Sequence, residues 1–370
     1  MSTLARLLKE SWTCVEDRGD TLAANFYARV FLADPQLREL FPVTMDVQRS
    51  RLLEAIVQAV QTVDDPDAFA AYLTSLGRDH RKFHARPEHY DVVGNCLIAA
   101  LTEHVGAAWG PEFEQAWRDA YGVIAATMVA GAAEAADLPA YWHAEVIHHE
   151  RHGADLAQFT VRPLDPVPYR AGQYVSLETS HQPRLWRSYS VANAPRADGT
   201  LDFHARAIGA TGVSSALVRK LQPGDMIRIG APMGSMLLDL SSARDMVFVA
   251  GGTGLAPLRA LIEQLAETNR SRAAYLFFGV RHSEDLYDVP TLNALTAQHP
   301  WLSFTPVLSE QTDSAHPHGL VGEVCAAAGP WPEHDFYVAG SAAMVRATRA
   351  RLTEAGVPFD RIRYDAITTG

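Results

Sequence analysis

The first third of the chain has the hydrophobic spacing of helices. Apolar residues recur three or four positions apart, as at Leu22, Phe26 and Val30, and the stripe that they form ends at Asp34-Pro35. Similar stripes follow up to about position 134, and no alternating strand pattern interrupts them. We therefore predict a packed all-helical domain over residues 1–137.

One histidine in this region is predicted to point inward. Apolar residues recur at helical spacing between positions 69 and 83, and His80 falls on the same stripe. Pro87 suits the first turn of the next helix, on which Tyr90 is the first large residue. His80 and Tyr90 are thus expected on two helices joined by a short bend. Taken alone, His80 could equally be a core histidine bonded to a backbone carbonyl.

The pattern changes after position 137. Short alternating segments at 145–147, 159–161, 174–177, 201–205 and 226–229 are separated by Gly, Pro and Asp, which predicts an antiparallel barrel or sandwich. Three motifs occur in this region in a fixed order: Gly172-Gln173-Tyr174, Arg187-Ser188-Tyr189-Ser190 and Gly212-Val213-Ser214-Ser215.

The last third has continuous apolar strands at 246–250, 274–278, 302–308 and 336–339, with helical stretches between them. This is typical of a parallel sheet covered on both faces. The first strand runs directly into Gly251-Gly252-Thr253-Gly254-Leu255-Ala256-Pro257, and a helix is predicted from Leu258. Backbone amides at such a turn can bind a pyrophosphate, although a lone glycine turn can also be purely structural.

Composition narrows the class of partner. The 370 residues suit two or three domains, and 32 basic against 43 acidic residues give a net charge of −11, which argues against nucleic acid or an anionic membrane as the main partner. Three scattered cysteines form no disulfide framework, zinc motif or iron–sulfur motif. We see no signal peptide and no membrane span, and we expect a cytoplasmic protein.

Several segments of the first third resemble the haem domain of the flavohaemoglobins. They are Asn25-Phe26-Tyr27, Glu39-Leu40-Phe41, Gln48-Arg49, the stretch from His80 through Pro87 to Gly94, and Ala120-Tyr121-Gly122-Val123. The spacing of His80, Pro87 and Tyr90 is the most specific part of the likeness. The resemblance implies an all-α globin domain that binds haem b.

The resemblance also implies roles on both sides of the haem. His80 resembles the proximal ligand of the iron, and Tyr90 and Glu134 match positions that hydrogen-bond this histidine. Such partners make the imidazole more basic and favour turnover of bound oxygen over its storage.

On the other side, Tyr27 and Gln48 resemble the distal pair that hydrogen-bonds bound oxygen. Phe41 resembles the aromatic residue that packs on the porphyrin. Each of these residues, taken singly, could instead be an ordinary core or surface side chain.

The middle and last thirds resemble the ferredoxin-reductase-like family. The likeness implies that Tyr189 stacks on the flavin, that Arg187 binds its diphosphate, and that the other flavin contacts are Tyr174, Ser188, Ser190 and Ser214. The glycine turn resembles the nicotinamide-nucleotide loop, with contacts from Gly252, Thr253, Gly254, Leu255, Ala256 and Pro257. The implied fold is an antiparallel FAD-binding β-barrel followed by an α/β parallel-sheet NAD(P)-binding domain.

Two places bear on the nucleotide and the flavin. Phosphate-selecting relatives have an arginine after a serine, whereas Ser309 of this chain is followed by Glu310. Its carboxylate would repel the extra phosphate of NADPH, so we predict NADH over NADPH. Arg281 could still bind a phosphate. Near the end of the chain, Ile367 stands where the family has an aromatic residue over the flavin, and Ala366 and Ile367 are the contacts that the resemblance implies there.

The likeness covers essentially the whole chain, so we predict three domains: 1–137 globin, 138–240 FAD-binding barrel and 241–370 NAD(P)-binding domain. The implied activity is nitric oxide dioxygenation, which converts nitric oxide and oxygen to nitrate with NADH. The implied partners are these small molecules, and we expect a monomer. Two alternatives remain: a flavohaemoglobin-like oxidoreductase acting on another donor of the D-lactate type, which lacks the proximal hydrogen-bonding pair, and an oxygen or redox sensor whose reductase resets the haem.

Overall fold

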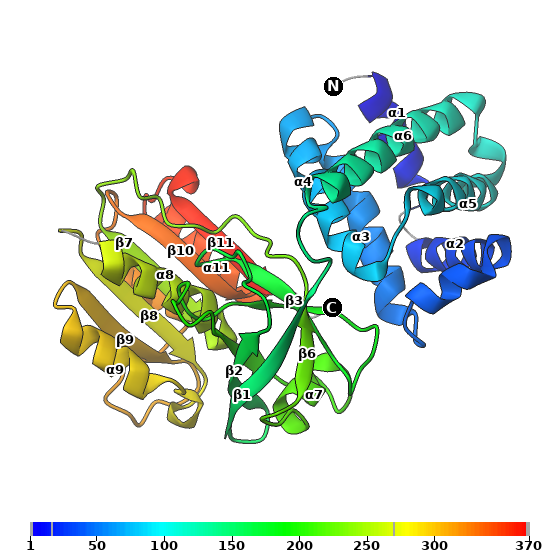
Figure 1. Cartoon of the computed structure of the whole chain (residues 1–370). Coiled ribbons are helices and arrows are strands. Elements are labelled where there is room, and N and C mark those ends of the chain that lie inside the picture. The colour runs from blue at the N-terminus through cyan, green and yellow to red at the C-terminus, as the bar shows by residue number, and fades with distance from the viewer. Residues whose placement is uncertain (1–2, 16–17, 269–270, 368–370) are drawn as a thin grey trace. The chain divides into compact units, whose positions relative to one another are not determined.

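The computed structural model describes residues 3–15, 18–268 and 271–367 (Figure 1). It divides into two compact units, one up to Tyr141 and one from Trp142 onward, and each unit is described by itself. Within the described residues, none of the helices is both long enough and apolar enough to cross a bilayer.

The first unit is all-helical, as predicted. Its helices are α1 (Thr3–Thr13), α2 (Gly19–Ala33), α3 (Asp46–Thr62), α4 (Pro66–His80), α5 (Pro87–Val105) and α6 (Pro111–Glu134), with short 3₁₀ turns at Pro35–Leu40, Arg81–Phe83 and Gly106–Ala108. Prolines occupy the first turn of α4, α5 and α6, where a missing N–H costs no hydrogen bond. The carboxylate of Asp65 caps α4 by accepting from the Ala68 N–H at 3.1 Å.

The position of α4 in this unit depends on a close crossing with α6. A Cβ atom added to Gly77 would lie 2.0 Å from the carbonyl oxygen of Met128, so only glycine lets the two backbones approach this closely. Phe69 and Leu73 of α4 are buried against Met128 beside the crossing. The crossing therefore fixes the last turn of α4, which carries His80.

The barrel predicted for the middle third is confirmed. Six antiparallel strands pair in the order β4-β3-β6-β1-β2-β5. They are β1 (Trp142–His152), β2 (Leu156–Pro163), β3 (Tyr174–Thr179), β4 (Arg187–Ser190), β5 (Leu201–Arg206) and β6 (Met226–Ile229). A bridge between Val191 and Phe203 brings the two edges together, and α7 (Val213–Arg219) packs on the barrel core through Val213 and Leu217.

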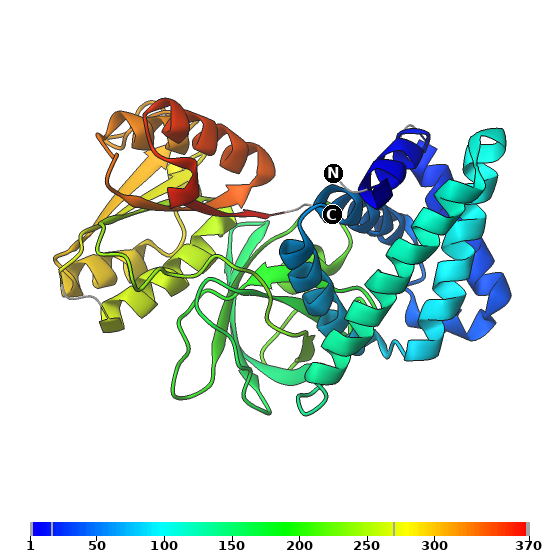
Figure 2. The ribbon, with the colours of Figure 1, turned by 90° about the horizontal axis from the view of Figure 1, so that it is seen from above.

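The last domain contains a five-stranded parallel sheet in the order β11-β10-β7-β8-β9. Its strands are β7 (Met246–Gly251), β8 (Ala274–Val280), β9 (Leu302–Leu308), β10 (Asp335–Ser341) and β11 (Ile362–Ile367), and its helices are α8 (Leu255–Thr268), α9 (Val289–Gln298), α10 (Val321–Ala327) and α11 (Ala342–Glu354). The helices cover both faces (Figures 1 and 2).

Alternation along β7 accounts for this layering. Phe248 packs on the side of α8, whereas Val247 and Val249 pack on the side of α10 and α11. A parallel strand buried on both faces reads as a continuous apolar run, as the sequence indicated. Two details differ from the prediction: α8 begins at Leu255 and not at Leu258, and β11 was not predicted.

Candidate cofactor-binding sites

His80 is the last residue of α4, and its contacts determine which nitrogen of its ring carries the proton. Its Nδ1 lies 2.8 Å from the carbonyl oxygen of Leu76. A carbonyl only accepts hydrogen bonds, so Nδ1 carries the ring proton and the lone pair is on Nε2. Desolvation lowers the pKa of His80, with Asp79 opposing the shift, so the ring is neutral near pH 7. A neutral imidazole with a fixed Nδ1–H is the form that ligates haem iron through Nε2.

Aromatic side chains gather around Tyr27 on α2. The Tyr27 ring lies 5.4 Å from that of Phe41 and 6.0 Å from that of Phe31, measured between centroids. The Tyr27 hydroxyl donates to the backbone carbonyl of Gln48 on α3 at 3.3 Å. Burial raises the pKa of Tyr27 to about 12 although this neighbour opposes the shift, so the hydroxyl keeps its proton and remains a donor. The structure thus brings the predicted residues Tyr27, Phe41 and Gln48 together.

The donor set fits haem better than a directly bound metal ion. Within the described parts of the chain, no group of three or more His, Cys, Asp or Glu side chains could hold a metal ion. An iron centre would therefore have to bring most of its own ligands. A porphyrin supplies four nitrogens and needs one protein imidazole, which is what His80 offers.

The predicted partners of His80 are Tyr90 and Glu134. Glu134 ends α6 and binds Arg78 at 2.6 Å with a 57% exposed side chain. Arg78 and His80 are two residues apart on α4 and point to different sides of the helix, so the pairing with Arg78 directs Glu134 to the side of α4 that Arg78 faces. Tyr90 packs among the apolar residues near Phe69. The Nδ1–H of His80 donates to the Leu76 carbonyl. The hydrogen bonds expected from Tyr90 and Glu134 to this histidine stay a prediction.

The Arg187–Ser190 motif forms β4, and its pairing with β3 decides which side chains share a face. Tyr189 lies opposite Val175 and Arg187 opposite Leu177, so the ring and the guanidinium point to the same side of the sheet. Burial raises the pKa of Tyr189, and the nearby charge of Arg187 opposes the shift. A flat aromatic next to a cation is what a flavin ring and its diphosphate need.

The other predicted flavin contacts lie on neighbouring elements. Tyr174 is paired with Ser190 across β3 and β4, and its ring packs on Gly234, where an added Cβ would lie 3.0 Å from it. Ser188 is exposed on β4. Ser214 lies in the first turn of α7, and its Oγ accepts from the Ile208 N–H at 3.1 Å. The structure therefore brings Tyr174 and Ser190 together and places Ser214 after β5.

The glycine turn connects β7 to α8 through a 3₁₀ turn, Gly252–Gly254. A Cβ on Gly254 would lie 2.2 Å from the carbonyl oxygen of Ala339 on β10, so this glycine permits close contact between turn and strand. Thr253 is half-buried and accessible at the turn, whereas Leu255, Ala256 and Pro257 are buried in the first turn of α8. The arrangement of strand, tight turn and helix is the one predicted.

The end of β11 pairs with β10, the strand whose Ala339 contacts this turn. Ala366 and Ile367 are paired with Gly340 and Ser341 in the ladder between β10 and β11. Their side chains are outside the described residues, so the flavin contact expected of Ile367 stays a prediction.

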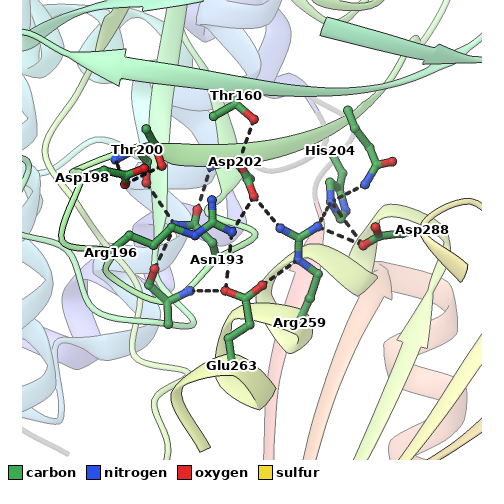
Figure 3. Close-up of polar contacts among 12 residues, drawn as sticks. Thr160, Asn193, Arg196, Asp198, Thr200, Asp202, His204, Arg259, Glu263 and Asp288 are labelled. Carbon is green, nitrogen blue, oxygen red and sulfur yellow. Dashed lines mark hydrogen bonds and ion pairs between the residues drawn. The ribbon is translucent and has the colours of Figure 1, made fainter. Parts of the chain in front are cut away.

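A buried group of charges was not anticipated from the sequence. Asp202 and His204 on β5 meet Arg259 and Glu263 on α8, together with Asp288 (Figure 3). These residues belong to no short motif and come from three distant segments. Only the polar residues within otherwise apolar stretches, such as Arg259 in α8, could have drawn attention to them.

Comparison with known proteins agrees with this architecture. Residues 24–128 match the globin family, residues 143–237 the oxidoreductase FAD-binding domain and residues 248–350 the oxidoreductase NAD-binding domain. A "Flavohemoprotein" of Bacillus subtilis is 26% identical over 97% of this chain and 95% of its own length.

Two solved structures have the same fold. The flavohemoglobin of Malassezia yamatoensis, crystallised with FAD and heme, aligns over 99% of both chains with a TM-score of 0.81 and 18% identity. The FAD/NAD-binding domain of a nitric oxide dioxygenase from Vibrio cholerae aligns over 61% of this chain and 98% of its own, with a TM-score of 0.55 and 22% identity. With its globin domain followed by FAD-binding and NAD-binding oxidoreductase domains, the chain belongs to the flavohaemoglobins.

Proposed function

We propose that this flavohaemoglobin is a nitric oxide dioxygenase, which oxidises nitric oxide to nitrate with oxygen and NADH. The proposal rests on two side chains of the helical unit. His80 has a neutral, oriented imidazole, and Tyr27 has a buried hydroxyl that keeps its proton. The V. cholerae nitric oxide dioxygenase, whose reductase domain has the same fold, supports the choice. We assign the three modules to residues 1–137, 138–240 and 241–370, acting as a monomer on small molecules.

Each module contributes through its own side chains. When bound, haem supplies the iron at which oxygen reacts, and FAD divides the hydride of NADH into single electrons. His80 would hold the iron through Nε2, and its Nδ1–H bond to Leu76 fixes the plane of the ring. The Tyr27 hydroxyl would turn from the Gln48 carbonyl to donate a hydrogen bond to the diatomic substrate, and the side-chain amide of Gln48 would supply a second donor toward its negative charge. Phe41 would pack on the porphyrin and help to exclude water.

Replacing Tyr27 by phenylalanine tests the distal role. Removing one donor that faces developing charge is expected to slow nitric oxide consumption by about 10²-fold, because such donors contribute that much in comparable sites. The rate is measured with a nitric oxide electrode on haem- and FAD-loaded protein. Tyr121→Phe is the matched control, since Tyr121 also donates to a backbone carbonyl, that of Tyr90 at 2.7 Å. Equal rates for the Tyr27 and Tyr121 variants would contradict the distal role.

One observation favours a second candidate function. Glu134, the acidic member of the expected proximal pair, is bound to Arg78. A flavohaemoglobin-like oxidoreductase that accepts another donor, of the D-lactate type, is expected to lack that pair. Flavin reduction by D-lactate at a rate equal to that with NADH would select this candidate over nitric oxide dioxygenation.

The choice of nucleotide is proposed from the residues after β8 and β9. The carboxylate of Glu310 lies 3.6 Å from Arg281 and 3.7 Å from His282. It is therefore paired with Arg281, the cation that could otherwise bind the 2′-phosphate of NADPH. The same negative charge repels that phosphate. We therefore propose NADH as the preferred reductant.

Glu310→Gln is expected to raise kcat/KM for NADPH by roughly tenfold and to leave that for NADH nearly unchanged, since an exposed charge is partly screened. Steady-state reduction of ferricyanide with each nucleotide measures both values. Glu323→Gln is the control, because Glu323 is likewise exposed and paired with an arginine, Arg351 at 3.6 Å. If the wild-type protein already uses NADPH with the higher efficiency, the preference for NADH is wrong.

A further inference from the structure

The buried charges between the barrel and α8 are arranged around Arg259. This side chain is 5% exposed and contacts three carboxylates: Asp202 at 2.5 Å, Asp288 at 3.0 Å and Glu263 at 3.2 Å (Figure 3). A buried guanidinium is stable only when nearby carboxylates neutralise its charge in this way. The hydrogen bonds to Asp202 and Asp288 fix Arg259 in place, and its Nη1 is directed at His204 as well.

The hydrogen bonds at His204 have a single consistent direction. The Nη1 of Arg259 lies 3.4 Å from His204 Nε2, and the Nε2 of Gln158 lies 3.1 Å from it. Arginine can only donate, so His204 Nε2 accepts. Burial lowers the pKa of His204 to about 3, which leaves the ring neutral with its one proton on Nδ1. That Nδ1–H therefore donates to the hydroxyl oxygen of Tyr287 at 3.0 Å.

The proton of Tyr287 then has one remaining acceptor. The Tyr287 hydroxyl lies 3.3 Å from the carbonyl oxygen of Gly252, in the glycine turn after β7. Tyr287 is 4% exposed and its ring packs against Phe278 of β8, so the hydroxyl is held in place. Hydrogen bonds thus run in one direction from Arg259 through His204 and Tyr287 to the backbone of Gly252. We call this series of hydrogen bonds the relay.

Fixing this carbonyl also fixes the peptide group that follows it. The bond between Gly252 and Thr253 is trans, and in a planar trans peptide the N–H points away from the C=O. Holding the Gly252 carbonyl toward Tyr287 therefore turns the Thr253 N–H to the opposite side of the turn. Gly252 has a φ of +53°, a left-handed conformation that glycine leaves easily, so an external contact is needed to keep one conformation.

We propose that Tyr287 is a positioning residue for the dinucleotide: with His204 and Arg259 it holds the glycine turn in the conformation that binds the NADH pyrophosphate, and ties that turn to β5 of the flavin barrel. The proposal rests on the proposed nucleotide-binding role of the turn. The barrel would then be part of the NADH site, because Asp202, which binds Arg259, and His204, which binds Tyr287, both belong to β5.

The test is Tyr287→Phe, which removes one hydroxyl and retains the ring. We expect the KM for NADH to rise about tenfold with kcat and thermal stability nearly unchanged, since about one net hydrogen bond is lost from the bound conformation. Rates are measured with NADH and ferricyanide on FAD-loaded full-length protein. Tyr275→Phe is the control: Tyr275 lies on β8 against Trp331, on the other face of the sheet.

A pair of substitutions at His204 separates positioning from general stability. His204→Asn keeps an N–H donor close to the position of Nδ1, whereas His204→Leu does not. If the relay holds the turn, the KM for NADH should be near the wild-type value in His204→Asn and raised in His204→Leu. An unchanged KM in Tyr287→Phe, or an equal rise in Tyr275→Phe, would overturn the proposal. The ferricyanide assay does not use the haem, so a failure of nitric oxide dioxygenation would leave this result standing.

Discussion

Replacing His80 by alanine is expected to give a protein that binds FAD but not haem. His80 is the one protein ligand proposed for the iron, and its Nδ1–H bond to Leu76 at 2.8 Å already directs Nε2 away from the helix backbone. Without this imidazole, no side chain that we propose as a ligand would hold the iron. The visible spectrum is expected to lose the Soret band and keep the flavin bands, and nitric oxide consumption is expected to fall to that of free haem.

The reductase should be unaffected, because the FAD-binding and NAD-binding domains form a separate compact unit. Ferricyanide reduction by NADH therefore serves as an internal control. His104→Ala, another partly buried histidine of the helical unit, is the matched variant and should keep its haem. Added imidazole should restore part of the Soret band to His80→Ala, since it can fill the space and ligate the iron. A His80→Ala protein with the wild-type spectrum would show that the iron is held elsewhere.

Gly254→Ala is expected to have the second large effect, on the NAD-binding domain. The new methyl group would lie 2.2 Å from the Ala339 oxygen, 2.4 Å from the Ala339 carbonyl carbon and 2.6 Å from the Gly340 nitrogen. All three are backbone atoms of β10, a central strand that cannot yield by rotating a side chain. Overpacking of this kind destabilises a domain by about 1–3 kcal/mol. The turn would also move, so flavin reduction by NADH should be lost.

Gly252→Ala separates this close contact from backbone strain. A Cβ on Gly252 meets nothing within 4 Å, but its φ of +53° is unfavourable for alanine. This variant is expected to lose only about 1 kcal/mol and to retain NADH oxidation with a raised KM. The measurements are thermal unfolding and anaerobic flavin reduction in a stopped-flow instrument. If Gly254→Ala is as stable and as fast as the wild type, the turn does not lie against β10 as described.

The elements were largely predictable because their signals are local. Helical stripes ended by Asp-Pro pairs gave α2 and α3, and Pro87 marked the start of α5. Continuous apolar runs gave β7 to β10, since both faces of each strand are buried. The last strand, β11, was not predicted because its segment mixes Arg363 and Asp365 with apolar residues and lies at the edge of the sheet.

The sites were predictable only in part. His80, Tyr27 and Gln48 could be singled out because a known family has them at the same spacing, and the structure brings Tyr27 to Gln48. The partner of Glu134 could not be read from spacing, because a shift of one or two positions on a helix changes the side that a residue faces. The relay to Gly252 joins positions 204, 252, 259 and 287, and pairings over such separations leave no periodic signal.

The proposed activity can be tested through the stoichiometry of nitric oxide consumption in air by protein loaded with haem and FAD. Nitric oxide, NADH and nitrate are followed together. We expect rapid, NADH-dependent loss of nitric oxide with nitrate as the product. Two nitrate ions should form for each NADH, because a hydride carries two electrons and each turnover uses one. Loss of nitric oxide no faster than with free haem, or without nitrate, would contradict it.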